Sequence, residues 1–148
     1  MKRSSTRAAT YDDANLILKL YDMRREPRMR EARRWFGASF KAKSYGELMT
    51  LCPPGSEPNA SYRMVTTYWE LVASFITCGV LHQELFFQTG RELLACWERV
   101  RDVAPDVRKQ VENPAEWKNL EAVANAYAKW WNTQAPGAYD AFVKRIRG

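Results

Sequence analysis

The segment over residues 62–78 constrains the fold more than any other part of the chain. Coiled as a helix at about 100° per residue, it places its polar side chains on one narrow stripe and leaves the rest of its circumference apolar. The stripe consists of Arg63, Thr66, Thr67, Glu70, Ser74 and Thr77. A helix that is apolar over most of its surface is usually surrounded by others, so this pattern predicts the central helix of a bundle.

Two helices are predicted in the first forty residues. Asp12 or Asp13 is a suitable cap for a first helix, which should end near Glu26. Pro27 disfavours helical geometry in the residue before it but suits the first turn of a new helix, which runs to about Phe40. The inner face of this second helix is predicted to comprise Met29, Ala32, Phe36 and Phe40.

The middle of the chain contains a short helix, a loop and a long helix. Ser44 and Glu47 have capping-box spacing and predict the short helix, whereas residues 52–61 are predicted to form a loop because of their prolines and glycine. Gly79 can end the central helix, and a long helix is predicted over residues 83–103. Gly90 within it predicts either close backbone packing or a bend.

The last third again has helix signals separated by breakers. Pro105 begins a short turn of helix. Asn113, followed by Pro114 and Glu116, predicts the start of a helix that runs to about residue 133. Pro136 and Gly137 then interrupt the chain before a final helix whose apolar residues are Tyr139, Phe142, Val143 and Ile146.

These signals predict an all-α fold: a single-domain helical bundle of about five main helices plus short ones. The helices over residues 62–78 and 83–103 are expected to form a central antiparallel pair. With 148 residues the chain has the usual size of one domain, which we place at residues 11–148 after a flexible basic tail over residues 1–10.

Apolar and cysteine residues indicate the compartment. No apolar run approaches the roughly 18 uncharged residues of a membrane-spanning helix, and the N-terminal segment lacks the pattern of a secretory signal. Cys52, Cys78 and Cys96 are far apart and odd in number, so they are expected to be reduced thiols. The sequence therefore predicts a cytoplasmic protein.

The net charge of +6 is confined to the first third of the chain. Residues 1–50 hold 12 basic and 6 acidic side chains, and the two signs balance in the remainder. An arginine-rich stretch dominates the excess and is a candidate polyanion-binding site: Arg24, Arg25, Arg28, Arg30, Arg33 and Arg34. Because Glu26 has the four-residue spacing for an ion pair with Arg30, the same residues also fit an ordinary solvated helix surface.

No residue pattern predicts catalysis or a cofactor. His82 is the single histidine and lies in a turn, where a capping or half-exposed role is expected. If His82 and Cys96 lie on one helix, they are fourteen residues and therefore about 20 Å apart. The imidazole and the thiol then cannot share a zinc ion. Glu70 is interpreted as a solvated or hydrogen-bonded carboxylate, and motifs for phosphate loops or nucleophile elbows do not occur. We expect no catalytic, cofactor-binding or metal-ligating residues.

Aromatic residues are abundant for so short a chain: six Trp, seven Tyr and six Phe. Trp117, Tyr127 and Trp131 share an apolar helix face and are assigned to the core. Trp35 and Trp130 fall toward the flanks of their helices and are predicted to mark a contact surface.

One stretch resembles a known family. The run Tyr68-Trp69-Glu70-Leu71-Val72, the turn Gly79-Val80-Leu81-His82-Gln83-Glu84-Leu85 and the run Cys96-Trp97-Glu98 are similar to the middle of an uncharacterised bacterial all-helical domain family of unknown function. The resemblance covers about a third of the chain. It implies a bacterial all-α domain and assigns no catalytic residue.

We therefore predict a non-enzymatic module that acts through contacts with a protein partner or with a second copy of itself as a homodimer. The alternative is a nucleic-acid or polyanion binder that uses the basic N-terminal third. An enzyme would need a deep cavity in which Glu70 meets a second carboxylate or an arginine.

Overall fold

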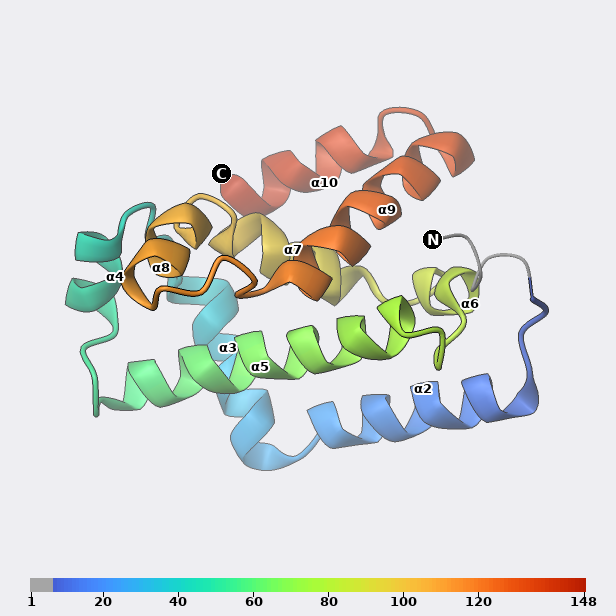
Figure 1. Cartoon of the computed structure of the whole chain (residues 1–148), viewed down its shortest axis with the longest axis horizontal. Coiled ribbons are helices and arrows are strands. Elements are labelled where there is room, and N and C mark those ends of the chain that lie inside the picture. Colours follow the sequence, from blue (N-terminus) through green and yellow to red (C-terminus); the bar gives the residue numbers. More distant parts are fainter. Residues whose placement is uncertain (1–6) are drawn as a thin grey trace.

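A computed structural model describes residues 7–148, which form nine helices and no strand (Figure 1). The predicted all-α fold is confirmed. A basic tail was predicted over residues 1–10, and residues 1–6 of it lie outside the described part of the chain. The helices are α2 (Tyr11–Arg24), α3 (Pro27–Ser39), α4 (Tyr45–Leu51), α5 (Glu57–Thr77), α6 (Gln83–Phe87), α7 (Arg91–Val100), α8 (Ala104–Gln110), α9 (Lys118–Gln134) and α10 (Ala138–Arg147).

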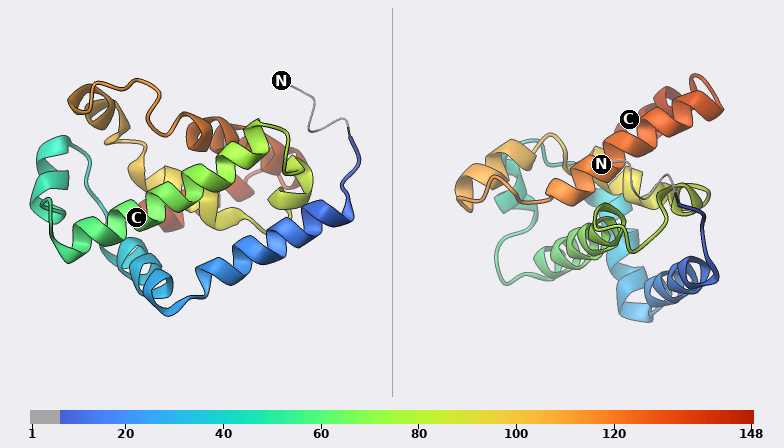
Figure 2. Two further views of the ribbon diagram at one scale, coloured as in Figure 1. Left: turned by 60° about the horizontal axis from the view of Figure 1, so that its bottom comes forward. Right: turned by 45° about the vertical axis from the view of Figure 1, so that its right-hand side comes forward.

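The central position predicted for the apolar helix is confirmed. Helix α5 packs mainly against α3, which crosses behind it, and against α9 (Figure 1). Figure 1 and the right-hand view of Figure 2 place α2 on one side of α5 and the pair α9 and α10 on the other. The core consists of large apolar side chains contributed by every helix. Among them, Trp69, Ile76, Leu93 and Tyr127 are almost completely buried.

The long helix predicted over residues 83–103 is wrong, because the chain breaks it into α6 and α7. Gly90 is the residue before α7, and a Cβ atom at this position would collide with the ring of Phe86. The glycine thus accommodates an aromatic ring rather than a neighbouring backbone. As a result, α5 lacks the single long antiparallel partner we expected and is held mainly by α3 and α9.

Three helix starts differ from the predicted positions. Thr10 caps α2 in place of Asp12 or Asp13, and the side chain of Asp13 bonds back to the Thr10 N–H to complete a capping box. Helix α5 begins at Glu57, five residues before the predicted position, because the Ser56 hydroxyl accepts a hydrogen bond from the N–H of Asn59. The predicted loop is correspondingly shorter.

The third difference concerns α9, which begins at Lys118 rather than near Pro114. Trp117 adopts a left-handed conformation with φ 59°, and this interrupts any helix started by Asn113. The Asn113 side chain instead accepts a hydrogen bond from the Ala115 N–H within a turn. The first turn of α9 is satisfied from another helix, since Glu70 Oε1 accepts from the Leu120 N–H at 2.8 Å.

The predicted boundaries of α3 and α4 and the predicted starts of α8 and α10 are confirmed to within a residue or two. The predicted inner face of α3 is buried, as are Val107 of α8 and Phe142 of α10. Within residues 7–148, no helix is both long enough and apolar enough to cross a membrane.

Candidate anion-binding cavity

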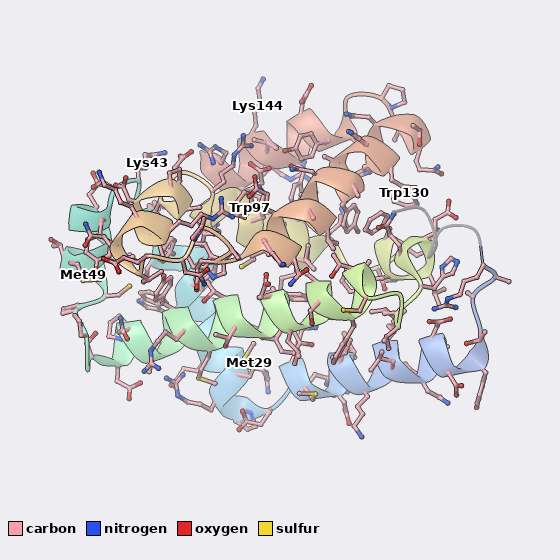
Figure 3. All side chains as sticks on the ribbon, in the orientation of Figure 1. Met29, Lys43, Met49, Trp97, Trp130 and Lys144 are labelled. Atoms are coloured by element: carbon pink, nitrogen blue, oxygen red, sulfur yellow. The ribbon has the colours of Figure 1, made fainter. Side chains whose placement is uncertain are left out.

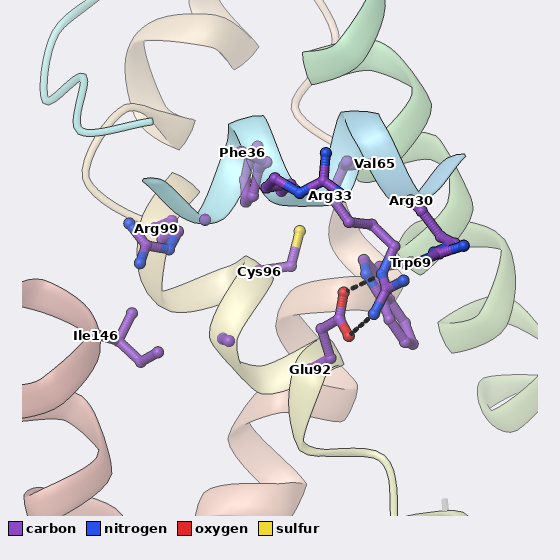
Figure 4. A pocket seen from close by; sticks show the side chains of 12 residues that line it. Arg30, Arg33, Phe36, Val65, Trp69, Glu92, Cys96, Arg99 and Ile146 are labelled. Carbon is purple, nitrogen blue, oxygen red and sulfur yellow. Dashed lines mark hydrogen bonds and ion pairs between the residues drawn. The ribbon is translucent and has the colours of Figure 1, made fainter. Parts of the chain in front are cut away.

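A cavity of about 410 Å³ lies between α3, α5, α7 and the end of α10 (Figure 4). Its size falls within the roughly 300–1,000 Å³ range of small-molecule sites. The lining joins four arginines and one glutamate to an apolar interior: Arg30, Arg33, Arg34, Phe36, Gly37, Val65, Trp69, Glu92, Ala95, Cys96, Arg99 and Ile146.

The inner wall of this cavity is apolar. Phe36, Val65, Trp69 and Cys96 are all buried, and each comes from a helix whose packing fixes it. The indole N–H of Trp69 is buried and has no acceptor among the described residues. A buried donor without an acceptor is uncommon in folded proteins, and this one is closed off from solvent.

The single carboxylate of the lining is already occupied. Glu92 Oε2 accepts from Arg33 Nε at 2.7 Å, and Glu92 Oε1 accepts from Arg33 Nη2 at 2.8 Å (Figure 4). Arg24 Nη1 donates to the same Oε1 at 3.0 Å. The bond to Glu92 raises the pKa of Arg33 above its usual value. Two guanidinium groups therefore share one carboxylate, and Glu92 has no capacity left to balance a third arginine.

Arg99 is the unbalanced charge at the opposite wall. It is half-buried, and its one hydrogen bond to a described residue runs from Nη1 to the carbonyl oxygen of Phe40 at 3.3 Å. No carboxylate of residues 7–148 lies within ion-pair distance of it. Burial lowers the pKa of its guanidinium below the usual value. A half-buried cation without a counter-ion indicates a place for an anion.

Arg30 and Arg34 complete the cationic rim. Both are exposed, and neither forms an ion pair within the described part of the chain. The ion pair predicted between Glu26 and Arg30 is absent, because Glu26 accepts from the Met29 N–H and so caps α3 instead. Arg30, Arg34 and Arg99 thus surround an apolar interior with three unpaired positive charges.

The structure divides the six arginines of the predicted polyanion site. Arg30, Arg33 and Arg34 line the cavity. Arg24 lies beyond Trp69, with its guanidinium carbon 5.3 Å from the indole ring centre, and Arg28 is bound to Glu57 and Ser61. Arg25 lies over the ring of Tyr21. Whether these side chains bind a polyanion stays a prediction.

Sequence reasoning missed Glu92 and Arg99, although a signal for them existed. Glu92, Cys96 and Arg99 are spaced by four and three residues, which places them on one face of a helix. We assigned neither Glu92 nor Arg99 to a site. Both faces of α7 are in fact buried, since Leu93 and Trp97 also lie in the core.

The other residues singled out from the sequence have structural roles. His82 caps α6, because its Nδ1 accepts from the Leu85 N–H while Nε2 lies 2.9 Å from the Arg7 carbonyl oxygen. Glu70 caps α9 and also accepts from Asn119. Burial raises the pKa of the Cys52 thiol to about 11, and that of Cys96 still further. Residues 7–148 contain no group of His, Cys, Asp or Glu side chains suited to a metal ion.

Trp35 and Trp130, the predicted contact surface, are both half-buried against the core. Trp35 packs edge-on to Phe40. Trp130 lies where α9 passes α6, contacts Phe87 and donates to Glu84 (Figure 3). Their role in binding a partner stays a prediction. The large apolar side chains with the greatest exposure include several on α2: Tyr11, Leu18, Tyr21 and Met23.

Residues 9–130 match a protein family described as a domain of unknown function (DUF4760). The match covers more than half of the chain, so the chain belongs to this family. This confirms the resemblance to an uncharacterised domain family, whereas a bacterial origin stays a prediction. Helix α10, which supplies Ile146 to the cavity, follows the matched residues. The chain matches no curated protein and no solved structure.

Proposed function

We propose that this member of the DUF4760 family binds a small anionic ligand that carries an apolar group, in the cavity between α3, α5, α7 and α10. The observation that carries the proposal is Arg99, a half-buried cation whose hydrogen bond within residues 7–148 is to a carbonyl oxygen rather than a carboxylate. Leaving a guanidinium partly desolvated without a counter-charge costs free energy. A bound carboxylate, sulfonate or phosphate would remove that cost.

The apolar wall supports a ligand with a hydrophobic part rather than a simple inorganic anion. Phe36, Val65 and Trp69 are almost fully buried and form the apolar inner lining of the cavity. An aromatic or aliphatic group against them would gain about 25 cal/mol for each Å² removed from water. The anionic group then lies among Arg30, Arg34 and Arg99, which set its position.

This proposal differs from the predicted nucleic-acid function in the shape of the site. Of the six arginines expected to bind a polyanion, Arg24, Arg28 and Arg33 already contact carboxylates. Of the other three, Arg30 and Arg34 border a concave cavity and Arg25 lies over the Tyr21 ring, so they do not form a continuous charged strip. A compact anion fits this arrangement better than a nucleic-acid backbone does, because several phosphates in a row need several free cations in a row.

The test uses the fluorescent probe 8-anilinonaphthalene-1-sulfonate, an aromatic anion, and its uncharged relative N-phenyl-1-naphthylamine. We expect saturable binding of the sulfonate to the wild-type protein and much weaker binding of the neutral probe. Arg99→Met should weaken sulfonate binding at least tenfold, which corresponds to about 1.4 kcal/mol. Arg30→Gln with Arg34→Gln should weaken it similarly, and neither exposed side chain supports the fold.

The matched control is Arg63→Gln, which removes the same charge from an exposed position on α5 outside the cavity. Circular dichroism and thermal unfolding check that each variant is folded. Equal affinity for both probes, or equal affinity in wild type and Arg99→Met, would contradict the proposal. Tight, strongly salt-dependent binding of labelled duplex DNA that requires Arg30 and Arg34 would favour the nucleic-acid alternative.

A second candidate function is self-association through α2. Tyr11, Leu18 and Tyr21 are 81%, 64% and 52% exposed, and their spacing of seven and three residues places them along one side of the helix. Such a row supports the predicted homodimer better than the half-buried tryptophans do. Sedimentation velocity tests this candidate: a dimer that Leu18→Glu converts to a monomer supports it, and a wild-type monomer at high concentration excludes it.

The free cysteines support the prediction that the protein works in a reducing compartment such as the cytoplasm. Cys52 and Cys96 are buried and Cys78 is exposed, and all three are unpaired. An exposed free thiol is uncommon in proteins of oxidising compartments.

A further inference from the structure

We infer that Gly37 is a specificity-determining residue of the cavity, where its missing side chain lets the apolar body of the ligand lie directly against the backbone of α3. This inference rests on the proposed function. It also narrows the ligand class to an anion whose apolar part is flat or unbranched enough to contact a helix backbone.

The backbone conformation at residue 37 does not explain why this residue is a glycine. It lies within α3, and it is not among the glycines of positive φ, which are Gly55, Gly79, Gly137 and Gly148. Glycine in a helix interior is destabilising relative to alanine because it gains the most backbone freedom on unfolding. Helix α3 is therefore less stable with Gly37 than it would be with alanine at the same position.

The packing around Gly37 gives no reason either. A Cβ atom built at this position meets nothing within 4 Å outside the local backbone. The contrast with Gly90 is direct, because a Cβ there would collide with Phe86. Gly37 is exposed and lines the cavity, so a side chain there would extend into open space at the cavity's edge.

The position of Gly37 on α3 indicates what uses the space. Arg30, Arg34 and Gly37 are spaced by four and three residues, so they lie on one face of the helix. One turn further on, the Phe40 carbonyl oxygen holds the guanidinium of Arg99. Gly37 thus lies between the exposed arginines and Arg99, on the path of any ligand that contacts both.

The experiment compares Gly37→Ala and Gly37→Leu with Gly46→Ala, using 8-anilinonaphthalene-1-sulfonate as the probe. Gly46 is a matched control because it lies within a helix, a Cβ there meets only an ordinary contact with Ser44, and it does not line the cavity. Both alanine variants should raise the melting temperature by about 2–4 °C, as expected when a helix glycine is replaced in a chain of this size.

Only the Gly37 variants should affect binding. We expect Gly37→Ala to raise the dissociation constant of the sulfonate about threefold or more and Gly37→Leu to abolish saturable binding, while Gly46→Ala binds like wild type. If sulfonate binding depends on Arg99 but is unchanged in Gly37→Leu, this inference is wrong and the proposed function is retained. Wild-type binding that is absent, or insensitive to Arg99→Met, would overturn the proposed function and this inference with it.

Discussion

Two neighbouring residues of α7 are charged and at least half-buried, yet their surroundings are opposite. Glu98 is 1% exposed and is surrounded by partners: Arg101 at 3.2 Å, Arg147 at 3.9 Å and the hydroxyl of Tyr139. Burial and the hydrogen bond to Glu98 raise the pKa of Tyr139 to about 12. Arg99, the next residue, faces the cavity and has no carboxylate partner in the described part of the chain.

The difference arises because consecutive residues of a helix point about 100° apart. Glu98 faces α10, whose Tyr139 and Arg147 reach it, and it connects the last helix to the bundle. Arg99 faces α3, and the carboxylate in that cavity, Glu92 of α7 itself, is already shared by Arg24 and Arg33. A charge that the fold balances supports the fold, whereas a charge that the fold leaves unbalanced is available to a ligand.

The largest effect that tests this comparison is expected from Glu98→Gln. The substitution removes the buried charge that accepts from Tyr139 and pairs with Arg101, while Arg147 keeps Asp102 as a partner. Each hydrogen bond to a charged group typically contributes about 1.5–3 kcal/mol. Urea unfolding at neutral pH measures the loss. Glu112→Gln, at an exposed position without an ion pair in residues 7–148, is the control and should change stability little. A loss equal to that of the control would mean that the Glu98 cluster does not support the fold.

A smaller effect is expected when the pH is lowered, and it concerns Asp13. This is another buried carboxylate whose charge an arginine balances. Its carboxylate is 2% exposed, accepts from Arg7 at 2.7 and 2.8 Å and from the His82 N–H at 2.9 Å. The bonds from Arg7 hold the pKa of Asp13 far below its usual range. The unfolded chain therefore takes up this proton at a higher pH than the folded one does.

The sign follows from that order of protonation. The stabilisation from Asp13 is fully present above its unfolded pKa of about 3.9 and is lost as the pH falls below that value. The stability difference between wild type and Asp13→Asn should shrink by about 2 kcal/mol between pH 5 and pH 2.5. Unfolding by urea at both pH values measures it. A difference that does not depend on pH would show that the Arg7 pair does not form in solution.

The smallest effect on stability is expected from Arg99→Met, although it should weaken sulfonate binding at least tenfold. Methionine fills a similar volume without a charge that needs solvation, so the free energy of unfolding should stay within about 1 kcal/mol of wild type or increase. The same urea titration provides the measurement. If Arg99→Met destabilised the protein as much as Glu98→Gln, Arg99 would be part of the structural framework and the contrast between the two residues would fail.

Much of the fold was predictable from local sequence signals. The apolar circumference of α5 predicted its central position, and Pro27, Pro105 and the pair Pro136–Gly137 predicted helix boundaries that the structure confirms. The predictions failed where a distant residue decides the outcome. Gly90 breaks the chain between α6 and α7 where the Phe86 ring occupies the space of a side chain, and Glu70 of α5 caps α9.

The sequence alone determined which stretches are helical and which of their faces are apolar, because helix periodicity, caps and breakers act over three or four residues. It also determined that arginine is concentrated in the first third of the chain. Only the tertiary structure decided which arginines are balanced. Arg33 meets Glu92 and Arg99 meets the Phe40 carbonyl across 59 residues in each case. Such pairings depend on how α3 packs against α7, and no local pattern records that.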